Sequence, residues 1–231
     1  MRTRIKICGI TRAEDLDAAI DAGVDALGFV FYSKSPRYIK PLEVKKLLRR
    51  APAWITSVGL FVNSNIEEVN RAAGESQVSH IQLHGDESPQ ECESLDRPVV
   101  KAIRLPLVND FSSRSSYEEA IEVKSKEVEF FSSVCSAVLF DVDSPGFGGS
   151  GISFDWGILN NILNLTDKRW VLSGGLSIDN IKLAIRKFNP PCVDISSGVE
   201  EVIKGKLQKG KKDRVKIFNF VKSVELANKV E

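Results

Sequence analysis

The sequence lacks the marks of a membrane protein, of a secreted disulfide-rich protein and of a zinc protein. No stretch of its 231 residues approaches the roughly 20 apolar residues of a membrane-spanning helix, and the N-terminus, MRTRIKICGIT, lacks the apolar core of a signal peptide. Its cysteines are scattered without a CxxC pair, at Cys8, Cys92, Cys135 and Cys192. We therefore expect free thiols, no metal site and a cytoplasmic location.

The chain also lacks an excess of charge of either sign. Its formal net charge is +1, so we expect neither nucleic acid nor a membrane surface as a partner, and local groups must hold any anionic ligand. There is no internal repeat and no low-complexity tract. The length and a hydrophobic content of 42% predict a single domain over residues 1–231, with a core that needs no disulfide or metal.

The sequence does contain eight short β-rich runs that alternate with segments of helical periodicity. The predicted strands cover residues 4–8, 26–31, 57–62, 80–84, 99–103, 137–140, 170–173 and 192–195. Eight β/α units in this length favour a (β/α)8 TIM barrel, an α/β fold, over an open doubly wound sheet. The absence of a GxGxxG motif after the first strand points the same way.

Some helix boundaries are predicted by capping signals. Thr11, with Glu14 three residues later, predicts a capping box, and Gly23 predicts the end of that helix. Gly74 predicts the end of the helix that begins at Ile66. The Ser-rich opening and charged middle of residues 109–133 leave the helix boundaries there undetermined.

The lysine-rich segment 204–216 precedes the last predicted helix. We expect it to be a solvated loop. The alternative is a role in attracting an anionic substrate over a long range, an effect that salt would weaken.

Small and polar residues follow the seventh and eighth strands. The two segments are Ser173, Gly174 and Gly175, and Ser196, Ser197 and Gly198. Their backbone N–H groups and hydroxyls, with a short helix N-terminus after the eighth strand, predict a phosphate site. The alternative is that these glycines only turn the chain.

Cys8 and Asp141 are the candidates for proton transfer. Cys8 ends the first strand, before a predicted helix whose N-terminus would favour the thiolate; the alternative is a buried core thiol. Asp141 ends the sixth strand beside a glycine-rich stretch, and the alternative is a carboxylate that caps the following loop. On opposite sides of one ligand, the two would supply a base and an acid.

Further polar residues at strand ends are candidates for substrate contacts. Arg37, after the second strand, suits a carboxylate, although it could also be a surface arginine. His84 ends the fourth strand and is either a ligand contact or a packed, hydrogen-bonded histidine. Asp194 lies in the eighth strand, and Gly149 belongs to a glycine-rich wall that can approach the substrate. Asp143 and Asp155 are less favoured acids.

Several motifs, taken together, resemble the phosphoribosylanthranilate isomerase family. They are KICGIT (6–11), GFVFYSKSPRYI (28–39), VGLFVN (58–63), IQLHGDE (81–87), KAIR (101–104), LFDVDSPGFGGSGISFDW (139–156), VLSGGL (171–176) and VDISSGVE (193–200). They run nearly end to end in the family's order. The chain departs from the pattern in residues 109–133 and in GKLQKGKKD, which expands a short glycine-Lys-Asp ending.

The resemblance implies an isomerase of tryptophan biosynthesis that performs an Amadori rearrangement on a phosphorylated aminosugar, without a cofactor. It implies Cys8 as the general base and Asp141 as the general acid. It also implies that Arg37 meets the anthranilate carboxylate and that the two Ser-Gly loops hold the phosphate. A barrel that binds a phosphorylated ligand without catalysis, or a histidine-pathway sugar-phosphate isomerase, are the alternatives. Monomer and homodimer both stay open.

Overall fold

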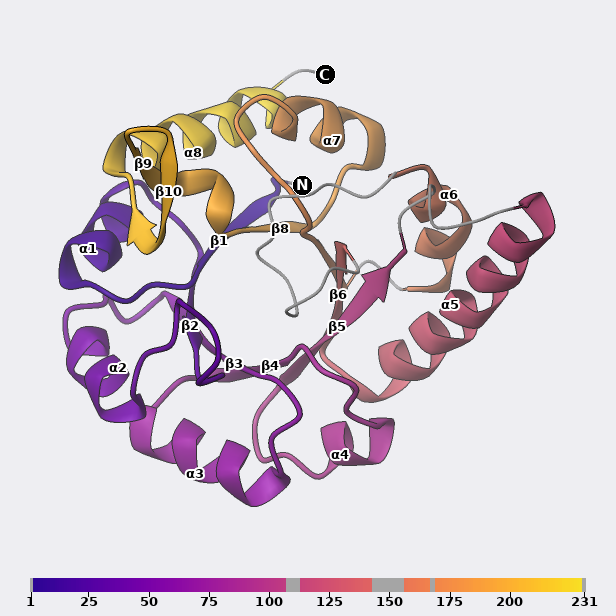
Figure 1. The fold of residues 1–231 in the computed structure, drawn as a ribbon, viewed down its shortest axis with the longest axis horizontal. Coiled ribbons are helices and arrows are strands. Elements are labelled where there is room, and N and C mark those ends of the chain that lie inside the picture. Colours follow the sequence, from indigo (N-terminus) through magenta and orange to yellow (C-terminus); the bar gives the residue numbers. More distant parts are fainter. Residues whose placement is uncertain (1, 107–112, 143–155, 167–168, 230–231) are drawn as a thin grey trace.

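The computed structural model describes residues 2–106, 113–142, 156–166 and 169–229, and eight of its strands close into a parallel barrel in sequence order (Figure 1). The barrel strands are β1 (Arg4–Cys8), β2 (Ala26–Val30), β3 (Thr56–Phe61), β4 (His80–Leu83), β5 (Val99–Leu105), β6 (Ala137–Val142), β7 (Trp170–Leu172) and β8 (Cys192–Ile195). β1 pairs with both β2 and β8, which closes the ring. The predicted (β/α)8 TIM barrel is confirmed.

Helices surround the barrel (Figure 1). They are α1 (Ala13–Asp21), α2 (Pro41–Leu48), α3 (Ile66–Ser76), α4 (Pro89–Glu93), α5 (Arg114–Val134), α6 (Leu159–Ile162), α7 (Ile181–Phe188) and α8 (Arg214–Asn228). Three short 3-10 turns, η2 (Trp156–Ile158), η3 (Leu163–Leu165) and η4 (Ser197–Val199), and a hairpin of β9 (Glu200–Ile203) and β10 (Lys206–Lys212) complete the described elements. No helix among the described residues is long and apolar enough to cross a membrane.

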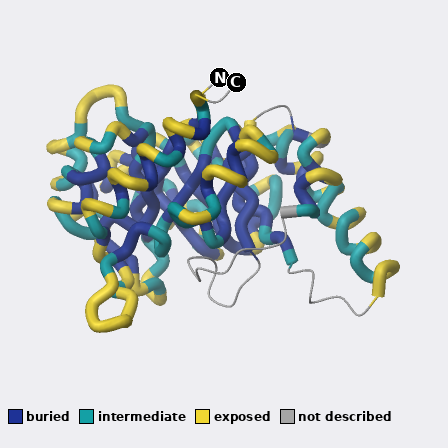
Figure 2. The backbone as a smooth tube through the Cα atoms, turned by 90° about the horizontal axis from the view of Figure 1, so that it is seen from above, coloured by how far each residue is buried: buried dark blue, intermediate teal, exposed yellow. Residues whose placement is uncertain are grey.

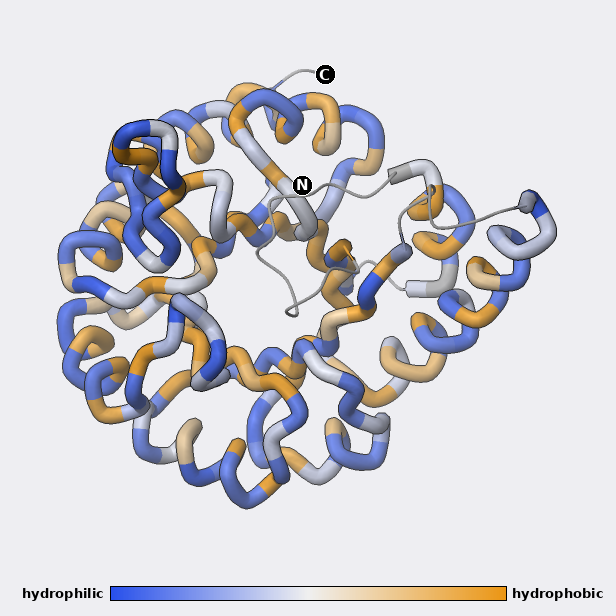
Figure 3. The backbone as a smooth tube through the Cα atoms, viewed as in Figure 1, coloured by the Kyte–Doolittle hydropathy of each residue, from blue (hydrophilic) through white to orange (hydrophobic). Residues whose placement is uncertain are grey.

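Alternation along each strand divides its side chains between two environments. In β1, Ile5 and Ile7 join the main core between the strands and the helices, whereas Cys8 belongs to a small interior cluster with Val30 and Leu60. The strands are almost wholly buried (Figure 2), and hydrophobic residues run through them while the helices alternate in hydropathy (Figure 3). Cys8, one of the predicted site residues, therefore faces the barrel interior at the end of its strand.

Two predicted helix boundaries are wrong. Thr11 does not cap α1, because the N-cap position is Arg12, without a side-chain cap, and the Thr11 hydroxyl donates to the carbonyl of Gly210 instead. Gly74 does not end α3, which continues to Ser76 and stops where Gln77 adopts a left-handed φ of 64°. In contrast, Gly23 has a φ of 82° just beyond α1, as predicted for a glycine at a helix end.

The lysine-rich segment is not only a solvated loop, which corrects the expectation from sequence. Its residues 204–207 are exposed and project from the barrel (Figure 2), but β9 and β10 pair as an antiparallel hairpin. Lys212 is only 3% exposed. The physical reason is Glu200, a buried carboxylate that accepts hydrogen bonds from the Gly210 N–H and the Lys212 ammonium.

Candidate active site

A cavity of about 440 Å³ opens at the carboxyl ends of the barrel strands. This volume suits a small-molecule ligand. The predicted site residues that line it are Cys8, Arg37, His84, Asp141, Ser173, Gly174, Gly175, Asp194, Ser196 and Ser197. They converge because parallel strands of a closed barrel all end at one rim.

Cys8 lies on the interior side of β1, in contact with a buried ion pair. Side chains alternate along a strand, so Lys6 and Cys8 share a face. The Lys6 ammonium donates a 2.7 Å hydrogen bond to Oδ2 of Asp194 on the neighbouring β8. The same ammonium lies beside the Cys8 sulfur, because a Cβ atom at Gly28 on the adjacent β2 would stand 2.9 Å from the sulfur and 3.0 Å from the Lys6 nitrogen. The base candidate therefore lies next to a buried cation and its carboxylate partner.

The predicted effect of a helix N-terminus on Cys8 is wrong. α1 begins only at Ala13, after the turn at Gly9. Burial raises the pKa of the Cys8 thiol above its ordinary value, and Lys6 and Lys212 lower it without outweighing burial. Lysine side chains therefore supply the favourable charge that we expected from the helix.

Asp141 lies at the rim in contact with His84. Its Oδ1 accepts a 2.8 Å hydrogen bond from the Val142 N–H, and its Oδ2 lies 3.1 Å from Nε2 of His84. Nδ1 of His84 lies 3.0 Å from the amide nitrogen of Gln82. With that amide donating to Nδ1, a neutral imidazole carries its proton on Nε2, the nitrogen that faces Asp141.

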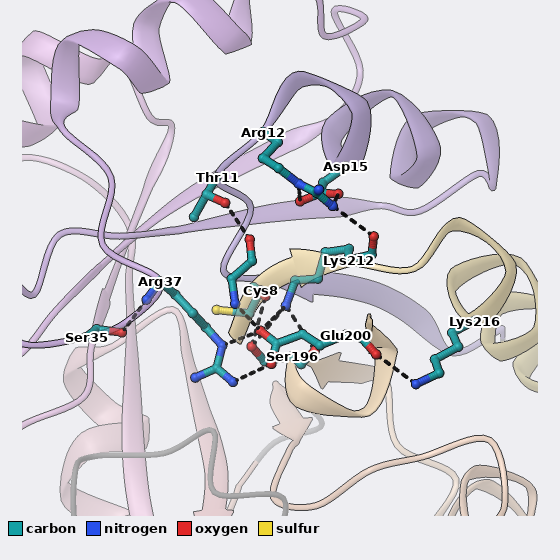
Figure 4. Close-up of polar contacts among 11 residues, drawn as sticks. Cys8, Thr11, Arg12, Asp15, Ser35, Arg37, Ser196, Glu200, Lys212 and Lys216 are labelled. Atoms are coloured by element: carbon teal, nitrogen blue, oxygen red, sulfur yellow. Dashed lines mark hydrogen bonds and ion pairs between the residues drawn. The ribbon is translucent and has the colours of Figure 1, made fainter. Parts of the chain in front are cut away.

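Arg37 is buried, so the alternative of a surface arginine is wrong. Its Nε and Nη2 donate to the two carboxylate oxygens of Glu200, at 2.7 and 2.9 Å (Figure 4). The Lys212 ammonium approaches Glu200 Oε1 at 3.3 Å and donates to the carbonyl of Ser196 at 3.0 Å. Although burial raises the pKa of Glu200, Arg37 and Lys212 together bring it below its ordinary value. This ionised cluster fixes Arg37 at the edge of the cavity.

The two Ser-Gly segments lie against one another at the carboxyl ends of β7 and β8. Gly174 and Gly175 have φ values of 79° and 66°, which a glycine adopts without strain. Gly198 packs on the carbonyl of Leu176, because a Cβ atom there would stand only 2.2 Å from that oxygen. Gly198 itself is not part of the cavity lining, and it serves to bring the two loops together. The helix expected after β8 is the single turn η4.

Some predicted residues lie outside the described part of the chain. These are Gly149, together with the less favoured acids Asp143 and Asp155. Among the described residues, no group of three or more histidine, cysteine, aspartate or glutamate side chains could hold a metal ion.

Sequence reasoning missed four residues around the site: Lys6, Gln82, Glu200 and Lys212. Two of them carried a usable signal. Lys6 precedes Cys8 by two positions and Gln82 precedes His84 by two positions, so the period of a strand places each on the face of its partner. Glu200 and Lys212 meet through the fold of the hairpin, which no local pattern revealed.

Comparison with known proteins points to a single family. Residues 5–223 match the family model of N-(5'-phosphoribosyl)anthranilate isomerase. An N-(5'-phosphoribosyl)anthranilate isomerase of Dechloromonas aromatica is 42% identical over 230 residues, which is 99% of each chain. A solved structure of monomers of the dimeric enzyme from Thermotoga maritima is 32% identical, with a TM-score of 0.77 and coverage of 96% of this chain and 98% of that one.

A further solved structure of the family contains a bound ligand. It shows a phosphoribosylanthranilate isomerase in complex with reduced 1-(o-carboxyphenylamino)-1-deoxyribulose 5-phosphate. This chain is 33% identical to it, with a TM-score of 0.78, and the match covers 96% of this chain and 98% of that one.

Proposed function

Because the chain belongs to the N-(5'-phosphoribosyl)anthranilate isomerase family, the isomerases of tryptophan biosynthesis, we propose that its cavity rearranges this substrate with Asp141 as general acid and Cys8 as general base. The observation that carries the proposal is that both side chains line one cavity from different strands. A substrate between them would meet a proton donor on one side and an acceptor on the other.

The proposed reaction begins with the opening of the furanose ring. Asp141 donates a proton to the ring oxygen, and the lone pair of the anthranilate nitrogen forms an iminium as the C1'–O bond breaks. The His84 Nε2, 3.1 Å from Oδ2, lies beside the Asp141 carboxyl group and can orient it toward the ring oxygen.

The second proton transfer belongs to Cys8. As a thiolate, Cys8 accepts the proton from C2', and the electron pair of that C–H bond forms the C1'–C2' double bond while the nitrogen regains its lone pair. The resulting enolamine then gains a proton at C1' from the Cys8 thiol and loses the proton of its C2' hydroxyl to the Asp141 carboxylate, which gives the ketone and restores both side chains. Each transfer by a positioned side chain contributes about 10²- to 10⁴-fold in rate.

The substrate has two anionic ends, a carboxylate and a phosphate, and different residues of the rim can bind each. We propose that Arg37 attracts the anthranilate carboxylate, and that the segments at Ser173 and Ser196 hold the phosphate. Glu200 fixes the guanidinium from one side, which lowers the entropy lost when Arg37 binds a ligand. Asp194 also lines the cavity, and its Oδ1 is buried without a hydrogen-bond partner among the described residues, so it can accept a substrate hydroxyl.

The first prediction tests the acid and base directly. Cys8→Ala and Asp141→Asn should each lower turnover by about 10²-fold or more, because each removes one proton transfer. Both variants should still bind the reduced product analogue, measured by calorimetry, while turnover is followed by loss of substrate fluorescence. Cys92→Ala is the matched control, since Cys92 is a buried thiol away from the cavity lining and should leave turnover intact. Full turnover in either site variant would refute the assigned role.

Two expectations from sequence stay predictions. The single-domain organisation is one, and a cytoplasmic location is the other. The oligomeric state also stays open between monomer and homodimer, and the related Thermotoga maritima enzyme is described in both forms.

A further inference from the structure

A charged side chain that the reaction itself does not use lies directly beneath the proposed base. Lys6 is only 5% exposed, and it does not line the cavity. Removing an ammonium from water is costly unless it is paired and hydrogen-bonded. Asp194 explains how Lys6 is tolerated. It does not explain why the same ammonium lies beside the Cys8 sulfur.

The space around this contact is kept free by a glycine of the adjacent strand. Gly28 is opposite Cys8 in the pairing of β1 with β2. A Cβ atom at Gly28 would stand 2.9 Å from the Cys8 sulfur and 3.0 Å from the Lys6 nitrogen. The sulfur and the ammonium therefore lie on the same side of Gly28, with no side chain from β2 to separate them.

Three charged groups from three elements act on Cys8. Lys6 on β1 and Lys212 on β10 favour the thiolate, and Asp194 on β8 opposes it. Lys6 has the strongest effect of the three, and its nitrogen and the Cys8 sulfur lie against the same side of Gly28. Burial favours the neutral thiol and is larger than any of these charges. A base in this position therefore depends on the nearest cation.

We propose that Lys6, held in place by Asp194, is a positioning residue that stabilises the Cys8 thiolate and so keeps Cys8 able to accept the substrate proton. The inference rests on the proposed function of Cys8 as the base. Lys6 keeps its own proton throughout. When the C2' proton moves to the sulfur, the ammonium loses its thiolate partner and keeps its hydrogen bond to Asp194.

The test follows the ionisation of Cys8 without relying on turnover. The alkylation rate of Cys8 by iodoacetamide is measured across pH, with mass spectrometry of the Cys8 peptide to separate it from the other thiols. Lys6→Met should move the midpoint of this profile to higher pH and lower kcat/KM at pH 7 by about tenfold or more, which corresponds to about one pH unit in the midpoint. Lys6→Arg keeps the charge and should restore most of both.

Two further variants separate this effect from loss of folding. The double variant Lys6→Met with Asp194→Asn leaves no unpaired charge, and its midpoint should still lie above that of the wild type because Lys6 outweighs Asp194 at the thiol. Lys101→Met with Glu87→Gln is the matched control. It removes another buried ion pair, at 3.0 Å, from residues outside the cavity lining, and should leave the midpoint unchanged.

The outcomes are distinct for the two proposals. A midpoint in the double variant at or below the wild-type value, or an equal shift in the control variant, overturns the role of Lys6. A raised midpoint with unchanged kcat/KM leaves Lys6 as the stabiliser of the thiolate and instead overturns Cys8 as the catalytic base.

Discussion

At the scale of single residues, Gly28 is a position where one added carbon atom should lower activity. An added Cβ would meet the Cys8 sulfur at 2.9 Å and the Cys8 Cα at 3.0 Å, and the latter belongs to the backbone of β1 and cannot rotate away. Gly28→Ala should therefore displace Cys8 and lower kcat/KM by about tenfold or more, because a base must be held in place for proton transfer. The overpacking should also lower the free energy of unfolding by about 1–3 kcal/mol.

Gly74→Ala is the matched control for this substitution. Gly74 lies inside α3, and a Cβ there has no neighbour within 4 Å. This variant should keep full activity and raise the melting temperature slightly, because alanine stabilises a helix relative to glycine. Equal activity in the two variants would show that the contact at Gly28 does not position Cys8.

The strand ends explain which site residues the sequence revealed. Cys8 and Asp141 were predictable because Cys8 is the last residue of a predicted strand, Asp141 directly follows an apolar run, and parallel strands of a barrel end at one rim. The charged residues around them were harder to predict from the sequence. The charge that acts on Cys8 comes from Lys6 and Lys212, and the second of these is distant in sequence and reaches the site through a hairpin. A local pattern cannot report a contact made by tertiary folding.

At the scale of secondary-structure elements, the β9–β10 hairpin connects the lysine-rich segment to the site. Gly210 anchors it: its N–H donates to Glu200, its carbonyl accepts from Thr11, and its φ is 83°. A Cβ at Gly210 would stand 3.0 Å from the carbonyl of Pro36, so β10 packs on the loop that carries Arg37. The hairpin thereby places Lys209 in the lining of the cavity.

Lys209 and Lys211 provide a matched pair for testing the hairpin. Both are exposed, they flank Gly210, and only Lys209 lines the cavity. Lys209→Gln should raise KM about two- to fivefold with little change in kcat, consistent with up to about 1 kcal/mol for an exposed charge, and added salt should reduce the difference. Lys211→Gln should have a smaller effect. Steady-state kinetics at two salt concentrations distinguish a local contact from a general attraction, which both substitutions would weaken equally.

Element boundaries were predicted to different degrees for identifiable reasons. β1 and β8 match the sequence prediction because β1 ends at the turn of Gly9 and β8 begins after Pro191. The end of α3 was misplaced because Gln77, rather than glycine, takes the left-handed conformation. In residues 109–133 the described part forms most of α5, which begins after a capping box of Ser113 and Ser116 that its serine-rich sequence concealed.

At the scale of the whole molecule, the two ends of the chain complete the same structure. β1 pairs with β8 to close the barrel, and the N–H of Thr3 donates to the side chain of Asn228 in α8 at 3.1 Å. At the opposite rim Glu200 makes a further long-range connection, because it bonds both Arg37, which follows β2, and Gly210 of β10. We propose that such connections make the chain one cooperative domain, in which loss of Glu200 weakens the whole barrel.

Glu200 gives this proposal a pH dependence with a definite sign. The pKa of Glu200 in the folded chain lies below its ordinary value of 4.5, so the unfolded chain binds its proton first as the pH falls. Its contribution to stability is therefore complete above pH 4.5 and is lost as the pH falls through the folded-state pKa. Glu200→Gln leaves Arg37 and Lys212 without their shared carboxylate, and should lower the free energy of unfolding at pH 7 by about 3–5 kcal/mol.

Urea unfolding at pH 7 and at pH 4 or below measures both effects. The variant should lose less additional stability on acidification than the wild type, because it no longer carries the titrating group. Glu201→Gln is the matched control, since Glu201 is part-exposed and pairs with Arg12, and it should cost about 1 kcal/mol or less. Transitions followed by circular dichroism and by tryptophan fluorescence should coincide if the barrel is one domain. Separate transitions would show that Glu200 supports only part of it.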